Sequence, residues 1–143
     1  MEFKASIIIQ APISLIFKQY QDVAHWPSWD KDIKYATLDG DFTVGSKGIL
    51  KPHKGPKSRF TLSEVTTNQS FTTRTKLPLC CITFEHSLKE TDSGTHVTHH
   101  VIFSGLLSPI FGKLVGKDIQ KGLPNALTGL KSVCESKAKG SRA

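Results

Sequence analysis

The sequence contains no apolar run as long as the roughly 18 to 20 residues that a membrane-spanning helix requires. The N-terminal segment MEFKASIIIQAP has a short apolar run without a small-residue cleavage site. We therefore interpret this segment as a first strand and not as a signal peptide. A cytoplasmic location is the default expectation.

Cysteine is also scarce, and the three cysteines Cys80, Cys81 and Cys134 show no CxxC spacing. Cys80 and Cys81 are adjacent, so in a strand they would point to opposite faces. This pattern argues against a disulfide framework and against a zinc cluster. We expect no metal and no cofactor.

Negative charge is in deficit, and the formal net charge is +7. The basic residues are spread thinly, apart from a group at 51–59 and another near the C-terminus. We interpret them as solvated loops and a basic tail, with transient contact with an anionic membrane surface as the alternative. No aromatic-rich RNA-binding segment is present, so no nucleic acid partner is expected.

Short segments of β-branched and alternating residues, separated by turn residues, predict a meander of antiparallel strands. The expected strands are 3–11, 32–39, 46–52, 58–66, 70–77, 79–90 and 95–105, with two short helices after the first of them, beginning at Pro12. From 108 to 137 the apolar residues recur at helical intervals, which predicts one long helix with a kink near Gly122 caused by Pro124. We expect a single domain over 1–137 and a loose tail over 138–143.

A TDSG turn at residues 91–94 follows one strand and precedes a strand with three histidines. A tight hairpin there would place His86 opposite His99, and the turns of the neighbouring hairpins extend the register across the sheet. The further expected pairs are Phe84–Val101, Ile82–Phe103, Leu62–Thr73, Phe60–Thr75, Thr73–Phe84, Phe71–His86 and Leu50–Phe60.

One face of the sheet is then apolar but includes threonines and histidines, while the other face is hydrophilic. Buried polar groups need partners or water, so a cavity that holds water or a ligand would explain the mixture. The expected lining is Trp26, Leu50, Phe60, Leu62, Thr73, Thr75, Ile82, Phe84, His86, His99, Val101, Phe103 and Leu114. A purely structural, hydrogen-bonded pair is the alternative for His86 and His99.

The order of these elements resembles the START-like superfamily, also called SRPBCC, which includes polyketide cyclases, dehydrases and lipid-transport proteins. The segments that carry the resemblance are QAPISLIFKQYQDVAHWPSWD, the Gly40–Gly45 turn, SEV near residue 64 and FSGLLSP before the last helix. The resemblance implies an α+β helix-grip fold, in which a curved seven-stranded antiparallel sheet surrounds the long C-terminal helix and leaves a hydrophobic cavity.

Three functions follow from this interpretation. In the first, the protein binds a small hydrophobic molecule such as a lipid, polyketide or quinone-like compound between sheet and helix. In the second, it is a cyclase or dehydratase in which His86 or His99 moves protons, since an ordinary histidine titrates near neutral pH. In the third, it is a protein-interaction module without a ligand.

Overall fold

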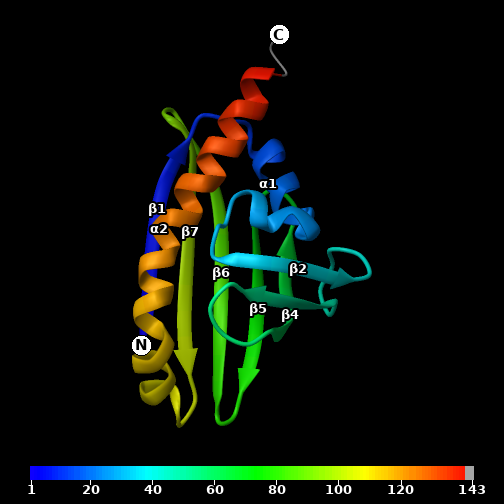
Figure 1. Ribbon diagram of the computed structural model, residues 1–143. Helices are drawn as coiled ribbons and strands as arrows, with labels where there is room; N and C mark the ends of the chain where they lie inside the picture. Colours follow the sequence, from blue (N-terminus) through cyan, green and yellow to red (C-terminus); the bar gives the residue numbers. More distant parts are fainter. Residues whose placement is uncertain (141–143) are drawn as a thin grey trace.

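The computed structural model describes residues 1–140 and shows a curved sheet with a long helix along one side (Figure 1). The elements in chain order are β1 (Glu2–Ile9), α1 (Ile13–Gln21), η1 (Val23–Ser28), β2 (Ile33–Asp39), β3 (Lys47–Pro52), β4 (Ser58–Thr66), β5 (Ser70–Leu77), β6 (Cys80–Thr91), β7 (Gly94–Ser104) and α2 (Ser108–Gly140). The seven antiparallel strands lie in the order β1-β7-β6-β5-β4-β3-β2. The expected α+β helix-grip architecture is confirmed.

The expected register is confirmed across the central strands. His86 pairs with His99, Phe84 with Val101 and Ile82 with Phe103. Phe71 pairs with His86 and Thr73 with Phe84, and Leu62 pairs with Thr73. These pairs place the two histidines side by side on the inward face, where alternation along each strand predicts them.

The pairing of Leu50 with Phe60 is wrong. Phe60 pairs with Gly48, and Leu50 pairs with Ser58. The centre of the turn between β3 and β4 therefore lies one residue nearer the N-terminus than the predicted pairing places it. Since the slip is two residues, Leu50 keeps the predicted face of the sheet.

Helix α2 is continuous across Pro124 and reaches Gly140. Residues 138–140 of the expected tail are thus helical, and 141–143 lie outside the described residues. The glycines of α2 allow close approach: a Cβ at Gly129 would overlap the carbonyl oxygen of Trp29, and one at Gly112 would overlap the sulfur of Met1. These contacts hold the helix against η1 and the start of β1.

Two apolar clusters fill the space between the elements. The first lies beneath α1, η1 and the C-terminal half of α2, and includes Tyr20, Trp26, Trp29 and Phe71. The second lies between the first half of α2 and strands β1, β6 and β7. Its buried members are Cys80, Ile82, Val101, Phe103 and Leu123, with Phe3, Phe84, Phe111, Val115 and Ile119 partly buried beside them.

Candidate functional site

The two inward histidines come from β6 and β7 at the boundary between the clusters. Their rings meet edge to face, with centroids 4.6 Å apart. The His86 ring stacks on Phe71 at 4.0 Å, and its Nδ1 lies 3.3 Å from the Phe71 carbonyl oxygen. His99 is buried, with 3% of its surface exposed. Both rings lie on the inward face of the sheet, where His99 is buried and His86 is partly buried.

Helix α1 adds a phenol to this pair. The Tyr20 hydroxyl oxygen and Nε2 of His99 form a hydrogen bond of 2.8 Å, and Tyr20 is fully buried. Tyr20 is not among the lining residues that the sequence predicts. The signal was present, because a tyrosine on a buried helix face needs a partner for its hydroxyl group.

The two tryptophans of the HWPSWD segment differ in one respect. The indole N–H of Trp26 donates to the Tyr20 carbonyl oxygen at 2.9 Å. The indole N–H of Trp29 has no hydrogen-bond partner among residues 1–140, although Trp29 is only 4% exposed. An unpaired buried donor costs about 1 to 3 kcal/mol, so Trp29 can bind an acceptor supplied by a ligand.

We call Tyr20, Trp29, Phe71, His86 and His99 the Tyr20 cluster. Their rings contact one another at centroid distances between 4.0 and 6.3 Å. Burial lowers the pKa of His86 to about 4 and lowers the pKa of His99 well below its usual value. Burial also raises the pKa of Tyr20 well above 10. At neutral pH both imidazoles are uncharged and the phenol keeps its proton.

The space beside the histidines is occupied, whereas the sequence predicts a cavity there. Tyr20, Phe71, Trp26 and Trp29 pack against the pair, and each is at most 5% exposed. The reason lies in α1 and η1, which bring three large aromatic side chains onto the sheet at this point. A ligand therefore contacts the Tyr20 cluster only at its edge, or after these side chains move.

The remaining expected lining residues fall into three groups. Leu50, Phe60 and Leu62 belong to the first cluster. Ile82, Phe84, Val101 and Phe103 belong to the second cluster. Leu114 is 70% exposed, so it lies apart from all of them.

Two hydroxyl groups lie next to the second cluster. Thr73 pairs with Phe84 and Thr75 pairs with Ile82, and these threonines are 6% and 8% exposed. The second cluster therefore combines an apolar surface with two threonine side chains, beside the Tyr20 cluster.

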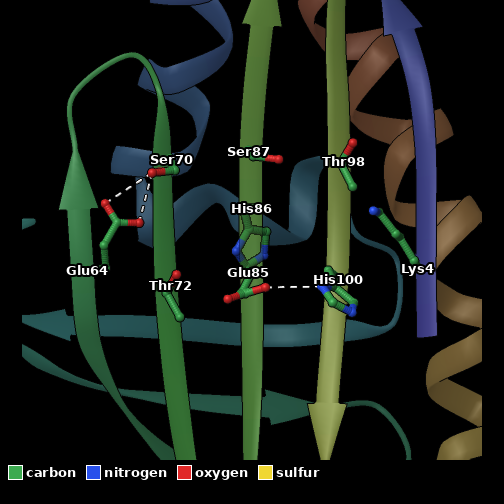
Figure 2. Close-up of a pocket in the computed structure, with 9 residues that line it drawn as sticks. All are labelled: Lys4, Glu64, Ser70, Thr72, Glu85, His86, Ser87, Thr98 and His100. Carbon is green, nitrogen blue, oxygen red and sulfur yellow. Dashed lines mark hydrogen bonds and ion pairs between the residues drawn. The ribbon is translucent and has the colours of Figure 1, made fainter. Parts of the chain in front are cut away.

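The opposite face of the sheet carries a polar depression of about 390 Å³ (Figure 2). Its two carboxylates have neighbouring partners: Ser70 donates to Glu64 at 2.8 Å, and Nδ1 of His100 lies 3.1 Å from a Glu85 oxygen. Figure 2 shows these pairs bridging adjacent strands. An apolar molecule gains little on this surface, so the inward face is the better candidate.

Within residues 1–140 no three His, Cys, Asp or Glu side chains lie close enough together to hold a metal ion. All three cysteines are free, and Cys80 belongs to the second cluster. No helix in this part of the chain combines the length and hydrophobicity needed to cross a membrane.

Solved structures share this architecture. The di-domain ARO/CYC StfQ from the steffimycin biosynthetic pathway matches with a TM-score of 0.79 and 12% identity over 96% of this chain, which covers 51% of StfQ. TTHA0849 from Thermus thermophilus matches with a TM-score of 0.73 and 16% identity, over 96% of this chain and 99% of that one. Ara h 8.0201 matches with a TM-score of 0.73 and 14% identity, over 95% and 98%. At these identities the likeness shows the fold alone.

The architecture and the mixed inward face define a START-like helix-grip protein, as the sequence predicts. A family model described as polyketide cyclase / dehydrase and lipid transport matches residues 1–135. The chain therefore belongs to this family. A search of curated protein sequences finds no significant match.

Proposed function

We propose that the protein binds a small hydrophobic molecule between the inner face of the sheet and the first half of α2. The apolar part of the molecule lies against Ile82, Phe84 and Val101, and its polar group points toward the Tyr20 cluster. The observation that carries this proposal is the buried indole N–H of Trp29 without an acceptor among residues 1–140. Family membership supports the same class of ligand: lipids, polyketides and similar compounds.

The side chains of the second cluster favour entry of the ligand between the sheet and the first half of α2. Phe84 on the sheet is partly exposed, as are Phe111 and Val115 on the helix. Helix α2 contacts β1 most, β7 less and β6 least, so the inner surface toward β5 is the part that α2 covers least. Burial of apolar surface stabilises a complex by about 25 cal/mol per Å² before the ordering costs are subtracted.

The titration properties of the histidines favour binding over catalysis. A general acid must carry a proton at the working pH, and a pKa of about 4 leaves His86 uncharged at neutral pH. Neutral imidazole and phenol groups can still accept and donate hydrogen bonds to a ligand. We therefore place the cyclase or dehydratase activity second, and the interaction module third.

The test begins with native mass spectrometry of the freshly purified protein, in which a bound lipid-like mass supports binding. It continues with two probes of similar shape, 2-acetylnaphthalene and 2-ethylnaphthalene, titrated by calorimetry. Only the first carries a carbonyl acceptor for Trp29. We expect tighter binding of 2-acetylnaphthalene by about threefold to tenfold, as one additional hydrogen bond gives.

The matched variants are Trp29→Phe and Trp26→Phe. Trp29→Phe should remove the preference for the ketone and leave binding of 2-ethylnaphthalene intact, while Trp26→Phe should keep the preference. Absence of any bound mass together with no binding of either probe would overturn the proposal. A preference that survives Trp29→Phe would assign the polar end of the ligand to other groups, such as Thr73 and Thr75.

Three expectations stay predictions: the absence of a nucleic acid partner, transient contact with an anionic membrane surface, and the cytoplasmic location.

A further inference from the structure

The exposed aliphatic side chains gather at one end of the molecule. Seven large hydrophobic residues are exposed among residues 1–140, and five of them belong to this end. These five are Met1 (55%), Leu79 (64%), Leu106 (83%), Ile110 (54%) and Leu114 (70%), which we call the apolar end. Scattered single residues of this kind are normal, but a contiguous group marks an interaction site.

Specific contacts bring these residues together. The Leu107 N–H donates to the Leu79 carbonyl oxygen at 3.0 Å and joins the β5–β6 turn to the β7–α2 turn. The Phe103 N–H donates to the Met1 carbonyl oxygen at 2.9 Å and holds the N-terminus beside the same turn. In Figure 1 both turns lie at the lower end of the sheet, next to the start of α2.

The start of α2 presents two rows of side chains on its outer surface. Ile110 and Leu114 are four residues apart and share one side of the helix start, and Leu106 lies in the turn just before the helix. Lys113 and Lys117 form the adjacent row and are exposed. A neighbouring side of the helix carries Phe111, Val115 and Ile119, which pack on the second cluster. The first half of α2 is thus apolar on two sides, and only one of them is covered.

Leu79 adds an independent observation. Its φ is +54°, a region that a leucine rarely adopts, and its side chain points into solvent. Glycine or asparagine would fit this turn with less strain. A strained and exposed leucine is a feature that function explains better than stability does.

The charged residues around the apolar end indicate what kind of partner it binds. Lys76, Lys113 and Lys117 are exposed beside it, and Asp118 is the one carboxylate between Ser108 and Gln120. A second copy of the chain would bring like charges together. An anionic lipid surface instead offers a hydrocarbon layer for the leucines and negative headgroups for the lysines.

We propose that the apolar end is a membrane-docking surface, which inserts Leu79, Leu106, Ile110 and Leu114 into an anionic lipid bilayer while Lys76, Lys113 and Lys117 contact the headgroups. This contact is peripheral and reversible. It does not depend on the ligand site, although it would bring the first half of α2, which covers that site, to the lipid surface.

The test is vesicle flotation with phosphatidylcholine alone and with phosphatidylcholine containing phosphatidylserine. We expect wild-type protein to float with the anionic vesicles and to dissociate as salt is raised. Leu106→Ser combined with Leu114→Ser should weaken binding by about tenfold or more, since each buried leucine contributes a large transfer free energy. Lys113→Glu combined with Lys117→Glu should abolish the preference for anionic vesicles.

The matched control is Val44→Ser, which removes an aliphatic side chain that is 63% exposed outside the apolar end. This variant should bind vesicles as the wild type does, and circular dichroism should show that all variants keep the fold. Failure of the wild type to bind either vesicle would overturn the proposal. Equal binding by the double serine variant would overturn insertion. A dimer in sedimentation analysis that the serine variant abolishes would assign the surface to a second copy of the chain.

Discussion

The hydroxyl oxygen of Tyr20 lies 2.8 Å from Nε2 of His99, and both side chains are buried. This hydrogen bond joins α1 to β7 across 79 residues of sequence. It satisfies one polar atom on each side chain in surroundings that are otherwise aromatic. The pair therefore fixes where α1 sits on the sheet and how the His99 ring is oriented.

Replacement of Tyr20 by phenylalanine tests this relationship. The hydroxyl group is lost and Nε2 of His99 is left buried without its partner, so we expect the free energy of unfolding to fall by about 1 to 3 kcal/mol. Urea denaturation followed by fluorescence measures the change. Tyr35→Phe is the matched control, because Tyr35 is 41% exposed, and it should have little effect. Equal stability of the two variants would contradict a structural role for the hydrogen bond.

The buried histidines predict a loss of stability in mild acid. Their pKa values are lowered in the folded protein, so below about pH 6.5 the unfolded chain binds more protons than the folded one. Stability should therefore fall from about pH 6.5 to pH 4, and His86 alone contributes on the order of 3 kcal/mol. Asp30 opposes this trend, because burial raises its pKa to about 6.

His86→Leu isolates the histidine contribution to this pH dependence. The difference between the urea midpoints at pH 7 and pH 5 should shrink in this variant and remain unchanged in His53→Gln, where an exposed histidine is replaced. If His86→Leu keeps the full difference, the His86 ring is not held neutral by burial.

The glycine of α2 that faces Trp29 predicts a position-specific steric effect. Gly129→Ala places a methyl group against the Trp29 carbonyl oxygen, which is main chain and cannot turn away. We expect destabilisation by about 1 to 3 kcal/mol despite the higher helix propensity of alanine. Gly140→Ala is the control on the same helix, since nothing lies within 4 Å of the new methyl group. Thermal unfolding compares the two, and a Gly129→Ala protein as stable as wild type would refute the close packing.

Leu79 predicts a gain in stability from substitution. Leu79→Asn should raise the free energy of unfolding by about 0.5 to 1 kcal/mol, because asparagine tolerates a positive φ better than leucine does. The control Leu106→Asn removes a comparably exposed leucine that has no positive φ, so its stability should not increase. Chemical denaturation measures both. A destabilised Leu79→Asn protein would show that the turn prefers leucine for its packing.

Periodicity and turn chemistry predicted most of the fold. The alternation in β5, β6 and β7, together with the tight TDSG turn, predicted the pairing of His86 with His99, because a register error of one residue would expose an apolar face. The HKGPK turn at residues 53–57 gave a wrong register for Leu50, since a loop that contains glycine and proline allows more than one alignment of the strands it joins.

The sequence by itself determined which residues face inward, since the side-chain direction follows from local backbone geometry. Only the tertiary structure decided which side chains these inward-facing residues contact. The hydrogen bond from Tyr20 to His99, the N–H of Trp29 left unpaired within residues 1–140 and the filled space beside the histidines all depend on how α1 and η1 pack on the sheet. Leu79, Leu106 and Leu114 lie at one end of the molecule because the β5–β6 turn contacts the β7–α2 turn. Leu79 in the first turn and Leu106 in the second are 27 residues apart in the sequence. Such contacts arise between segments distant in the chain, and no local pattern encodes them.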